Sequence, residues 1–263
     1  MITLLTDFGT ADYFVAAMKG VILSVNPDAA LVDVTHEIPP QDILSGAFTL
    51  YAVYRNFPEG TIHLAVVDPG VGSRRRAIVV STHNQYFVGP DNGLFSFIYE
   101  EEKGARVFHA TNEEYFRKPV SNTFHGRDIF APLAAALSKG VRAEELGFEI
   151  ADHIRLQNLR PNFVREGTLE ASIIHIDRFG NCVTNLTRRE VTDEMIEGGV
   201  MLTVNGRKIN SFRRFFAEET GASDNLFAIW GSAGHLEIAS NRASAARILN
   251  ARTGERILVM SDE

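Results

Sequence analysis

Cysteine is almost absent from this sequence, because Cys182 is the only one in 263 residues. A disulfide within the chain is therefore excluded, and so are most metal sites built from thiolates. The sequence also lacks any run near the roughly 20 apolar residues of a membrane-spanning helix. Its first residues have neither the basic stretch nor the long apolar stretch of a secretory signal. We expect a cytoplasmic protein with no membrane association.

Positive charge is scarce as well. Lys and Arg total 26 against 33 Asp and Glu, which gives a net charge of −7. This balance provides no broad attraction for nucleic acid or for an anionic membrane surface. The hydrophobic fraction of 45% and the charged fraction of 22% are those of an ordinary globular protein. The length suits one large domain or two modest ones.

The first half of the chain alternates apolar β-type runs with segments of helical period. The pattern predicts strands at residues 2–5, 31–34, 62–67, 78–81 and 86–88, and helices at about 12–26, 43–53 and 128–138. Asp42 is the expected N-cap of the second helix. Continuous apolar strands separated by helices are typical of a mostly parallel sheet covered on both faces. We therefore predict an N-terminal α/β sandwich domain over residues 1–154.

The second half has a different pattern of predicted elements. Short strands are predicted at residues 170–176, 200–204, 227–230, 236–239 and 257–260, with glycines between them. Segments long enough for helices are few. We predict a smaller β-rich domain over residues 168–263, joined to the first domain by a linker over residues 155–167 that contains Pro161.

Two carboxylates follow predicted strands of the first half. Asp7 comes after the first strand, and Asp68 leads into the glycine-rich segment 70–72. Ligands of open α/β sheets bind at the carboxyl ends of strands, although a lone Asp there often only caps a helix or forms a turn. A third glycine is missing, so the segment does not fit the dinucleotide-binding fingerprint. At least one arginine of 74–76 could reach back to Asp68 and fix its orientation.

A third polar cluster surrounds His125, just before the predicted helix. Asp128 is expected to cap that helix or to interact with its dipole. A lone histidine is more often structural than catalytic. His125, however, shares a short segment with Arg127 and Asp128, and imidazole suits proton transfer near neutral pH.

The β-rich half contains two segments that could bind a ligand. Residues 177–181 combine a carboxylate, an aromatic ring and an amide, and residues 231–239 form a glycine-rich strand entry. An amide can pair with a base edge, an aromatic ring can stack on it, and a carboxylate can bind an amine. The two segments suit a nucleoside or amino-acid site, while the first one alone would equally suit a β-turn.

Six motifs lie in order along both halves of the chain: Thr6-Asp7-Phe8-Gly9, Asp68-Pro69-Gly70-Val71-Gly72, Pro90-Asp91-Asn92-Gly93-Leu94, Thr123-Phe124-His125-Gly126-Arg127-Asp128, Phe179-Gly180-Asn181 and Gly231-Ser232-Ala233-Gly234. Together they closely resemble the S-adenosyl-L-methionine (SAM) hydroxide adenosyltransferases, and the resemblance runs essentially from end to end. These enzymes hydrolyse SAM to adenosine and L-methionine. They are related to fluorinating and chlorinating enzymes that attack SAM with halide.

The resemblance implies a water-activating triad of Asp68, Arg75 and His125, with Arg75 matched by its distance from Asp68 in the loop. The halide enzymes carry an aromatic hydroxyl where Asp68 stands and no histidine at the position of His125. The resemblance therefore implies attack by water on the ribose C5′ carbon, with methionine as the leaving group.

The substrate contacts are also implied by the resemblance. Asp7 would bind the ribose hydroxyls, and Asn181 would hydrogen-bond to the adenine with Phe179 nearby. The methionine amine and carboxylate would be held by Asp177 and Ser232. The halide enzymes have an arginine beside this serine, where Ala233 stands in this chain.

The resemblance further implies a C-terminal β-barrel-like domain and a homotrimer. The active sites would lie between the N-terminal domain of one subunit and the C-terminal domain of the next. SAM would be the substrate, with adenosine and L-methionine as products, and no cofactor or metal would be needed.

Two other functions remain open at this point. The oxygen and imidazole groups of Asp7, Asp68, His125 and Asp128 are of the kind that binds divalent cations, which would suit a metal-dependent hydrolase of a nucleoside-like substrate. A module that binds adenosine or SAM without catalysis would use Asp7 and Asn181 but would have no need of His125 beside Asp68.

Overall fold

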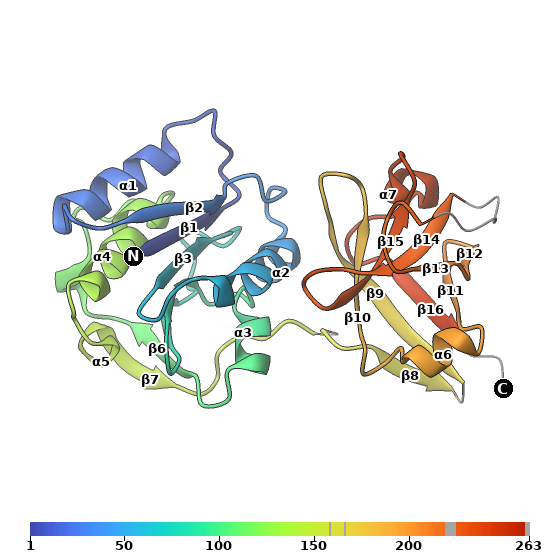
Figure 1. The fold of residues 1–263 in the computed structure, drawn as a ribbon. Coiled ribbons are helices and arrows are strands. Elements are labelled where there is room, and N and C mark those ends of the chain that lie inside the picture. The colour runs from blue at the N-terminus through green and yellow to red at the C-terminus, as the bar shows by residue number, and fades with distance from the viewer. Residues whose placement is uncertain (158, 166, 219–224, 261–263) are drawn as a thin grey trace. The chain divides into compact units, whose positions relative to one another are not determined.

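The computed structural model describes residues 1–157, 159–165, 167–218 and 225–260, and these form two compact units, Met1–Leu156 and Gln157–Glu263 (Figure 1). Each unit has its own sheet and hydrophobic core. Part of the range predicted as a linker is a strand, β8 (Asn162–Arg165), because it pairs with the antiparallel β9 (Thr168–Ile176). Residues 158 and 166 of that range lie outside the described residues.

The sheet of the first unit has the strand order β2-β1-β3-β5-β4-β6-β7. Its strands are β1 (Ile2–Thr6), β2 (Leu31–Thr35), β3 (Ile62–Val66), β4 (Ala77–Ser81), β5 (Tyr86–Pro90), β6 (Arg106–Ala110) and β7 (Gly147–Ile150). The neighbours β2, β1, β3 and β5 are parallel, as predicted. From β5 to β7 each neighbouring pair is antiparallel.

The antiparallel part follows from the length of one connection. Only residues 82–85 join β4 to β5. A parallel crossover needs a dozen or more residues, so a connection this short can only make a hairpin. The parallel region therefore ends at β5, and it is the region whose strand ends carry Asp7 and Asp68.

Helices cover both faces of this sheet (Figure 1). One face carries α1 (Phe14–Val25) and α4 (Ala131–Ser138), and the other carries α2 (Ile43–Val53) and α3 (Ser96–Glu101). Asp42 caps α2 as predicted, because its Oδ1 accepts a hydrogen bond from the Ser45 backbone N–H at 2.9 Å. Across the described ranges, no helix combines the length and apolarity of a membrane span.

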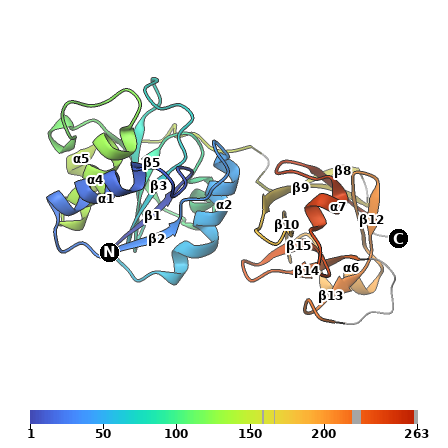
Figure 2. The same ribbon diagram turned by 90° about the horizontal axis from the view of Figure 1, so that it is seen from above.

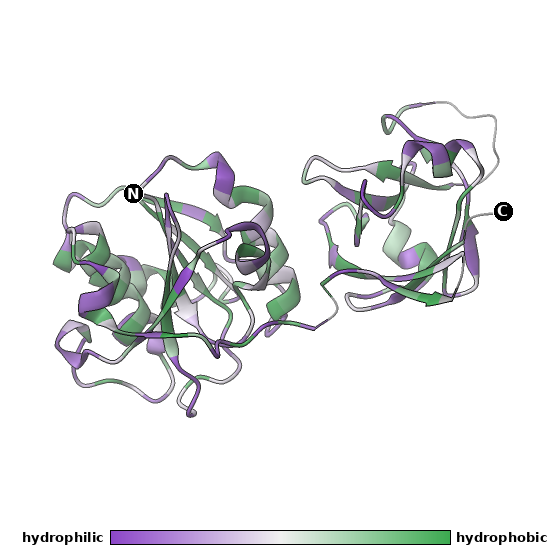
Figure 3. Cartoon of the chain, turned by 90° about the horizontal axis from the view of Figure 1, so that it is seen from below, coloured by the Kyte–Doolittle hydropathy of each residue, from purple (hydrophilic) through white to green (hydrophobic). Residues whose placement is uncertain are grey.

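Short helical segments complete the first unit. They are η1 (Tyr54–Asn56), η2 (Glu113–Tyr115), the π-helix η3 (Gly126–Phe130) and α5 (Ala143–Leu146). The helix predicted to begin near residue 128 thus begins at Gly126 as a π-helix, directly after His125, and continues as α4. Figure 3 shows hydrophobic residues concentrated along the strands and the inner faces of the helices. The main core includes Met18 and Ile22 of α1, Leu64 of β3 and Leu133 of α4.

The second unit is a curled sheet whose strand pairs are antiparallel except for β13 with β14, which is parallel (Figure 2). Its strand order is β12-β11-β16-β9-β10-β15-β14-β13, with β8 added beside β9. The remaining elements are β10 (Cys182–Thr187), α6 (Asp193–Glu197), β11 (Met201–Val204), β12 (Arg207–Ile209), β13 (Phe212–Arg213), β14 (Leu226–Trp230), β15 (His235–Ser240), α7 (Ala245–Leu249) and β16 (Arg256–Met260). The predicted α/β fold with a smaller β-barrel-like part is therefore confirmed.

His63 is a titratable group enclosed in the first core. It is fully buried in β3, its Nδ1 lies 2.8 Å from the Thr3 hydroxyl, and its ring stacks on Phe87 at 4.9 Å. Burial lowers the pKa of His63 to about 4, with a smaller opposing contribution from Gln85. The unfolded chain therefore binds a proton at a higher pH than the folded chain does.

This linkage predicts a loss of stability in acid. As the pH falls from about 6.5 towards 4, protonation of His63 in the unfolded chain should lower the unfolding free energy of the first unit by about 3 kcal/mol. Denaturant unfolding followed by far-UV circular dichroism should show that His63→Gln loses less stability than wild type between pH 7 and pH 4.5. An identical pH dependence in the two proteins would contradict the assignment.

Candidate active site

Two carboxylates lie at the carboxyl edge of the parallel strands. β1 and β3 are hydrogen-bonded neighbours, with Thr6 opposite Val66, so Asp7 and Asp68 leave the sheet side by side. Burial raises the pKa of Asp7, the Gln41 backbone N–H at 2.8 Å lowers it, and the nearby charge of Asp68 raises it further. Both carboxylates therefore follow strands, as the sequence predicted, and the two strands are neighbours in the sheet.

Arg75 connects Asp68 to His125. Its Nε donates to Asp68 Oδ1 at 2.9 Å and to Oδ2 at 3.0 Å, and its Nη2 also contacts Oδ2. The same Nη2 lies 2.6 Å from Nδ1 of His125. The guanidinium also lies over the Phe130 ring, with the guanidinium carbon 5.0 Å from the ring centroid. Its side chain is 9% exposed and that of Asp68 is 4% exposed, so little water competes for these contacts.

The contact with Arg75 fixes the protonation of His125. A guanidinium can only donate, so Nδ1 of His125 is assigned as the acceptor and Nε2 carries the proton. Burial lowers the pKa of His125, and the positive charge of Arg75 lowers it further, against smaller opposing contributions from Asp68, Asp128 and a hydrogen bond to the Ser121 backbone. His125 is therefore a neutral ring that can donate a hydrogen bond from Nε2.

The neighbouring arginines have different surroundings. Arg76 donates to Asp91 at 2.8 Å and to the side chain and carbonyl of Asp152 at 2.7 Å each, while Arg74 is exposed. Arg76 thus anchors the loop to the rest of the unit. Of the three arginines in the triplet, Arg75 is the one that reaches Asp68.

A close approach at Gly72 and a hydrogen bond from Asn92 set the position of the loop that carries Arg75. Gly72 has a left-handed φ of 77°, and a Cβ there would collide with the carbonyl oxygen of Asn122. A residue with a side chain would therefore push this loop away from the segment that leads to His125. Asn92 donates from Nδ2 to the Val67 carbonyl at 2.8 Å, which holds the chain just before Asp68.

Of the two roles expected for Asp128, capping is wrong, because His125 is the N-cap, whereas Asp128 does lie in the first turn of the helical segment, where its charge suits the dipole. Its carboxylate is fully buried and accepts hydrogen bonds from Arg127 at 2.7 Å, the Ser121 backbone N–H at 2.9 Å and Arg117 at 3.2 Å. Burial raises the pKa of Asp128, but these hydrogen bonds bring it below its ordinary value. The carboxylate folds the segment before His125 back on itself, and it does so because the helix begins earlier than predicted.

The metal-dependent alternative needs at least three donors that point at one position. Within the described ranges, no group of three or more His, Cys, Asp or Glu side chains has that arrangement. Asp68 is already bound to Arg75, and Asp128 is bound to Arg127.

The second unit contains the other group of predicted residues. A cavity of about 1130 Å³ is lined by all four of them, Asp177, Phe179, Asn181 and Ser232. The two segments that carry them are thus brought together, although about 50 residues separate them in the sequence. The structure places Asp7, Asp68, Arg75 and His125 in the first unit and these four residues in the second.

The segment 177–181 is a turn organised by Asp177. Its Oδ1 accepts from the backbone N–H groups of Phe179 at 2.9 Å and Asn181 at 2.8 Å, and its Oδ2 accepts from Asn181 Nδ2 at 2.9 Å. Residues 177–181 therefore form the turn that was one of the two interpretations of this segment, and that turn lines the cavity. Phe179 is 77% exposed, which leaves its ring free to stack, whereas Asn181 is buried.

Sequence reasoning missed Glu237, which also lines this cavity. Burial raises the pKa of Glu237 to about 7, and the charge of Asp177 adds to the increase. A signal was present in the strand pattern, because Leu236 and Ile238 lie in the core and Glu237 must point to the other face of β15.

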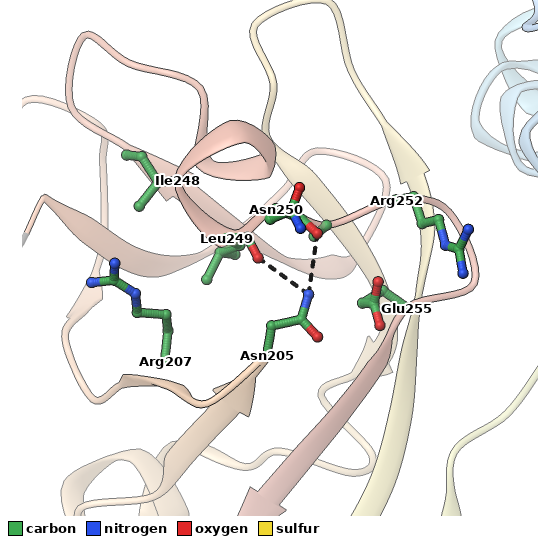
Figure 4. Close-up of a pocket in the computed structure, with 8 residues that line it drawn as sticks. Asn205, Arg207, Ile248, Leu249, Asn250, Arg252 and Glu255 are labelled. Atoms are coloured by element: carbon green, nitrogen blue, oxygen red, sulfur yellow. Dashed lines mark hydrogen bonds between the residues drawn. The ribbon is translucent and has the colours of Figure 1, made fainter.

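A second hollow of about 650 Å³ lies near the C-terminal end of α7 (Figure 4). Asn205 closes one side of it by donating to the carbonyls of Leu249 at 3.1 Å and Asn250 at 3.2 Å. None of the predicted site residues lines it.

Comparison with known proteins covers almost the whole chain. Residues 2–147 match the SAM hydroxide adenosyltransferase N-terminal domain, and residues 171–258 match the SAM hydroxide adenosyltransferase C-terminal domain. An (R)-S-adenosyl-L-methionine hydrolase from Thermus thermophilus is 39% identical, with 95% of each chain covered. A protein of the same name from Methanocaldococcus jannaschii is 36% identical, with 95% of this chain and 92% of that protein covered.

A solved structure shows the same fold. An uncharacterized conserved protein from Thermotoga maritima superposes with a TM-score of 0.88 at 36% identity, with 99% of this chain and 100% of that chain covered. The motifs of both halves, the full-length similarity and the shared fold agree. The chain therefore belongs to the SAM hydroxide adenosyltransferase family.

Proposed function

We propose that this protein is an enzyme that hydrolyses SAM to adenosine and L-methionine. The observation that carries the proposal is the Arg75 guanidinium held by hydrogen bonds to both Asp68 and His125, in a chain that belongs to this family. Relatives that are 36–39% identical over nearly the full length are named (R)-S-adenosyl-L-methionine hydrolase. A module that only binds SAM would have no use for this buried triad.

The reaction is an in-line displacement at the ribose C5′ carbon. Water loses a proton, its oxygen forms a bond to C5′, and the electron pair of the C5′–S bond moves to sulfur. The sulfonium becomes the neutral thioether of methionine, so the substrate itself provides the activated leaving group. We propose that no cofactor or metal takes part.

The triad supplies the nucleophile. Arg75 favours the hydroxide form of a bound water through its positive charge, and Nε2–H of His125 donates a hydrogen bond to the same oxygen. Asp68 has acceptor positions beyond those that Arg75 occupies, and it takes up the proton that water releases. Hydroxide and sulfonium lose charge as they meet, so exclusion of bulk water assists the step.

The remaining predicted residues bind the substrate in this proposal. Asp7 accepts hydrogen bonds from the ribose hydroxyls, Asn181 pairs with the adenine, and Phe179 stacks nearby. The methionine part lies towards Asp177 and Ser232. Ala233 offers no charge to the methionine carboxylate, unlike the arginine of the halide enzymes.

We also propose the homotrimer that the family resemblance implies. In it, the triad of one subunit and the cavity residues of a neighbouring subunit act on the same substrate molecule. The single cysteine suits the reducing cytoplasm, where we place the protein.

The reaction is tested directly with SAM in oxygen-18 water. Chelator-treated protein should release methionine and adenosine that carries the label on its 5′ oxygen, measured by mass spectrometry, because water is the nucleophile. Unchanged SAM would favour the binding module. Turnover that appears only after divalent ions are added would favour the metal-dependent hydrolase.

Arg75→Lys tests the triad with charge conserved. Lysine cannot donate to Asp68 and His125 with the fixed geometry of a guanidinium, so kcat should fall by about 10²- to 10³-fold, the usual cost of one lost donor to developing charge. KM should change little, because the substrate contacts lie elsewhere. The exposed neighbour provides the matched control, and Arg74→Lys should keep wild-type kcat. Equal kcat values for the two variants would rule out this role of Arg75.

A further inference from the structure

Glu237 is a carboxylate on the face of β15 that also carries the buried His235 and Ala239. The core residues Leu236 and Ile238 alternate with it along the strand, while the buried Ile229 and Ala239 lie on its own side of the sheet. A charged residue among buried apolar neighbours is costly unless a partner compensates it. Glu237 nevertheless lines the cavity of about 1130 Å³ that also contains Asp177, Asn181 and Ser232. Arg178, Arg242 and Arg247 line the same cavity, but none of them forms an ion pair with Glu237 in the described part of the chain.

The local backbone makes room for this carboxylate. A Cβ at Gly231 would collide with Oε1 of Glu237, so the carboxyl group lies directly over the Gly231 backbone. The described residues provide no hydrogen-bond donor and no ion-pair partner for Glu237. The proximity of Asp177 raises the cost of its charge further, because the two carboxylates repel each other. A cation bound in the cavity would remove both penalties.

Asp177 is less suited to direct contact with such a cation. Three donors of its own turn, two from Asn181 and one from Phe179, already occupy three of the roughly four acceptor positions of its carboxylate. Its clear structural effect is to orient the Asn181 side chain, through the bond to Nδ2. Asp177 therefore adds negative charge to the cavity and positions Asn181.

We propose that Glu237, rather than Asp177, accepts the hydrogen bond from the α-ammonium group of SAM in this cavity, an inference that rests on the proposed function. SAM has two cationic groups, the ammonium and the sulfonium. A sulfonium has no N–H or O–H to donate, so a free carboxylate acceptor matches the ammonium. Glu237 is then a specificity-determining residue for the amino-acid part of the substrate.

The test compares two substrates on the same enzyme. One is SAM, and the other is the deamino analogue, which keeps the nucleoside, sulfonium and carboxylate but lacks the α-amino group. Glu237→Gln should lower kcat/KM for SAM by about 10- to 100-fold, mainly through KM, because it removes one charge-assisted hydrogen bond. The same variant should match wild type on the deamino analogue.

Two further variants separate binding from structure. Asp177→Asn should lower kcat/KM for both substrates by the same factor, because it acts through Asn181. The matched control is Glu197→Gln, which removes one negative charge from an exposed position on α6 and should leave both values unchanged. Glu237→Gln is expected to fold, since it removes an uncompensated carboxylate, and a raised melting temperature without substrate at pH 8 would support this.

The outcomes distinguish the inference from the proposed function. If wild type hydrolyses SAM and Glu237→Gln lowers kcat/KM equally for both substrates, the carboxylate acts on the sulfonium or on the fold, and the inference is wrong. Wild-type kinetics of Glu237→Gln on SAM would overturn it as well. If wild type releases no adenosine from either substrate, the proposed function itself fails and the inference fails with it.

Discussion

The chemistry of this protein depends on one guanidinium that is shared by a carboxylate and an imidazole. Arg75 is paired with Asp68 and donates to Nδ1 of His125 at 2.6 Å. Because a guanidinium cannot accept, this contact makes Nδ1 the acceptor and places the ring proton on Nε2, while burial and the charge of Arg75 lower the pKa of His125. In the proposed mechanism, Arg75 therefore both provides the charge that activates water and positions the imidazole that orients it.

The rest of the first unit serves to hold that side chain in place. Parallel pairing of β1 with β3 brings Asp7 and Asp68 to one edge, and Asn92 holds the chain just before Asp68. Arg76 anchors the same loop to Asp91 and Asp152. The second unit provides a cavity of different character, with two neighbouring carboxylates. In the proposed function, the water-activating residues and Asp7 belong to the first unit, and the other substrate-binding residues belong to the second.

Sequence patterns predicted the parallel strands, the Asp42 cap and the two strand-end carboxylates, because these depend on local periodicity and turn residues. They did not predict the antiparallel pairing beyond β5, although the connection over residues 82–85 was short enough to require it. The residues themselves left the three arginines open, and Arg75 was singled out by the family resemblance through its distance from Asp68; in the structure, Asp91 and Asp152 bind Arg76 instead. Glu237 was missed because its significance comes from Gly231 and Asp177, which only the folded sheet brings near.

The most direct test of the account is the protonation of His125. In protein labelled with nitrogen-15 at histidine, NMR at pH 7 should show His125 with an unprotonated Nδ1 and a protonated Nε2. Because its pKa is lowered, the ring should remain neutral as the pH falls below 6.5, the ordinary value for histidine. Arg75→Gln, which removes the positive charge beside the ring, should raise that midpoint. A proton on Nδ1 at pH 7, or a wild-type midpoint at or above 6.5, would contradict the shared guanidinium on which the mechanism depends.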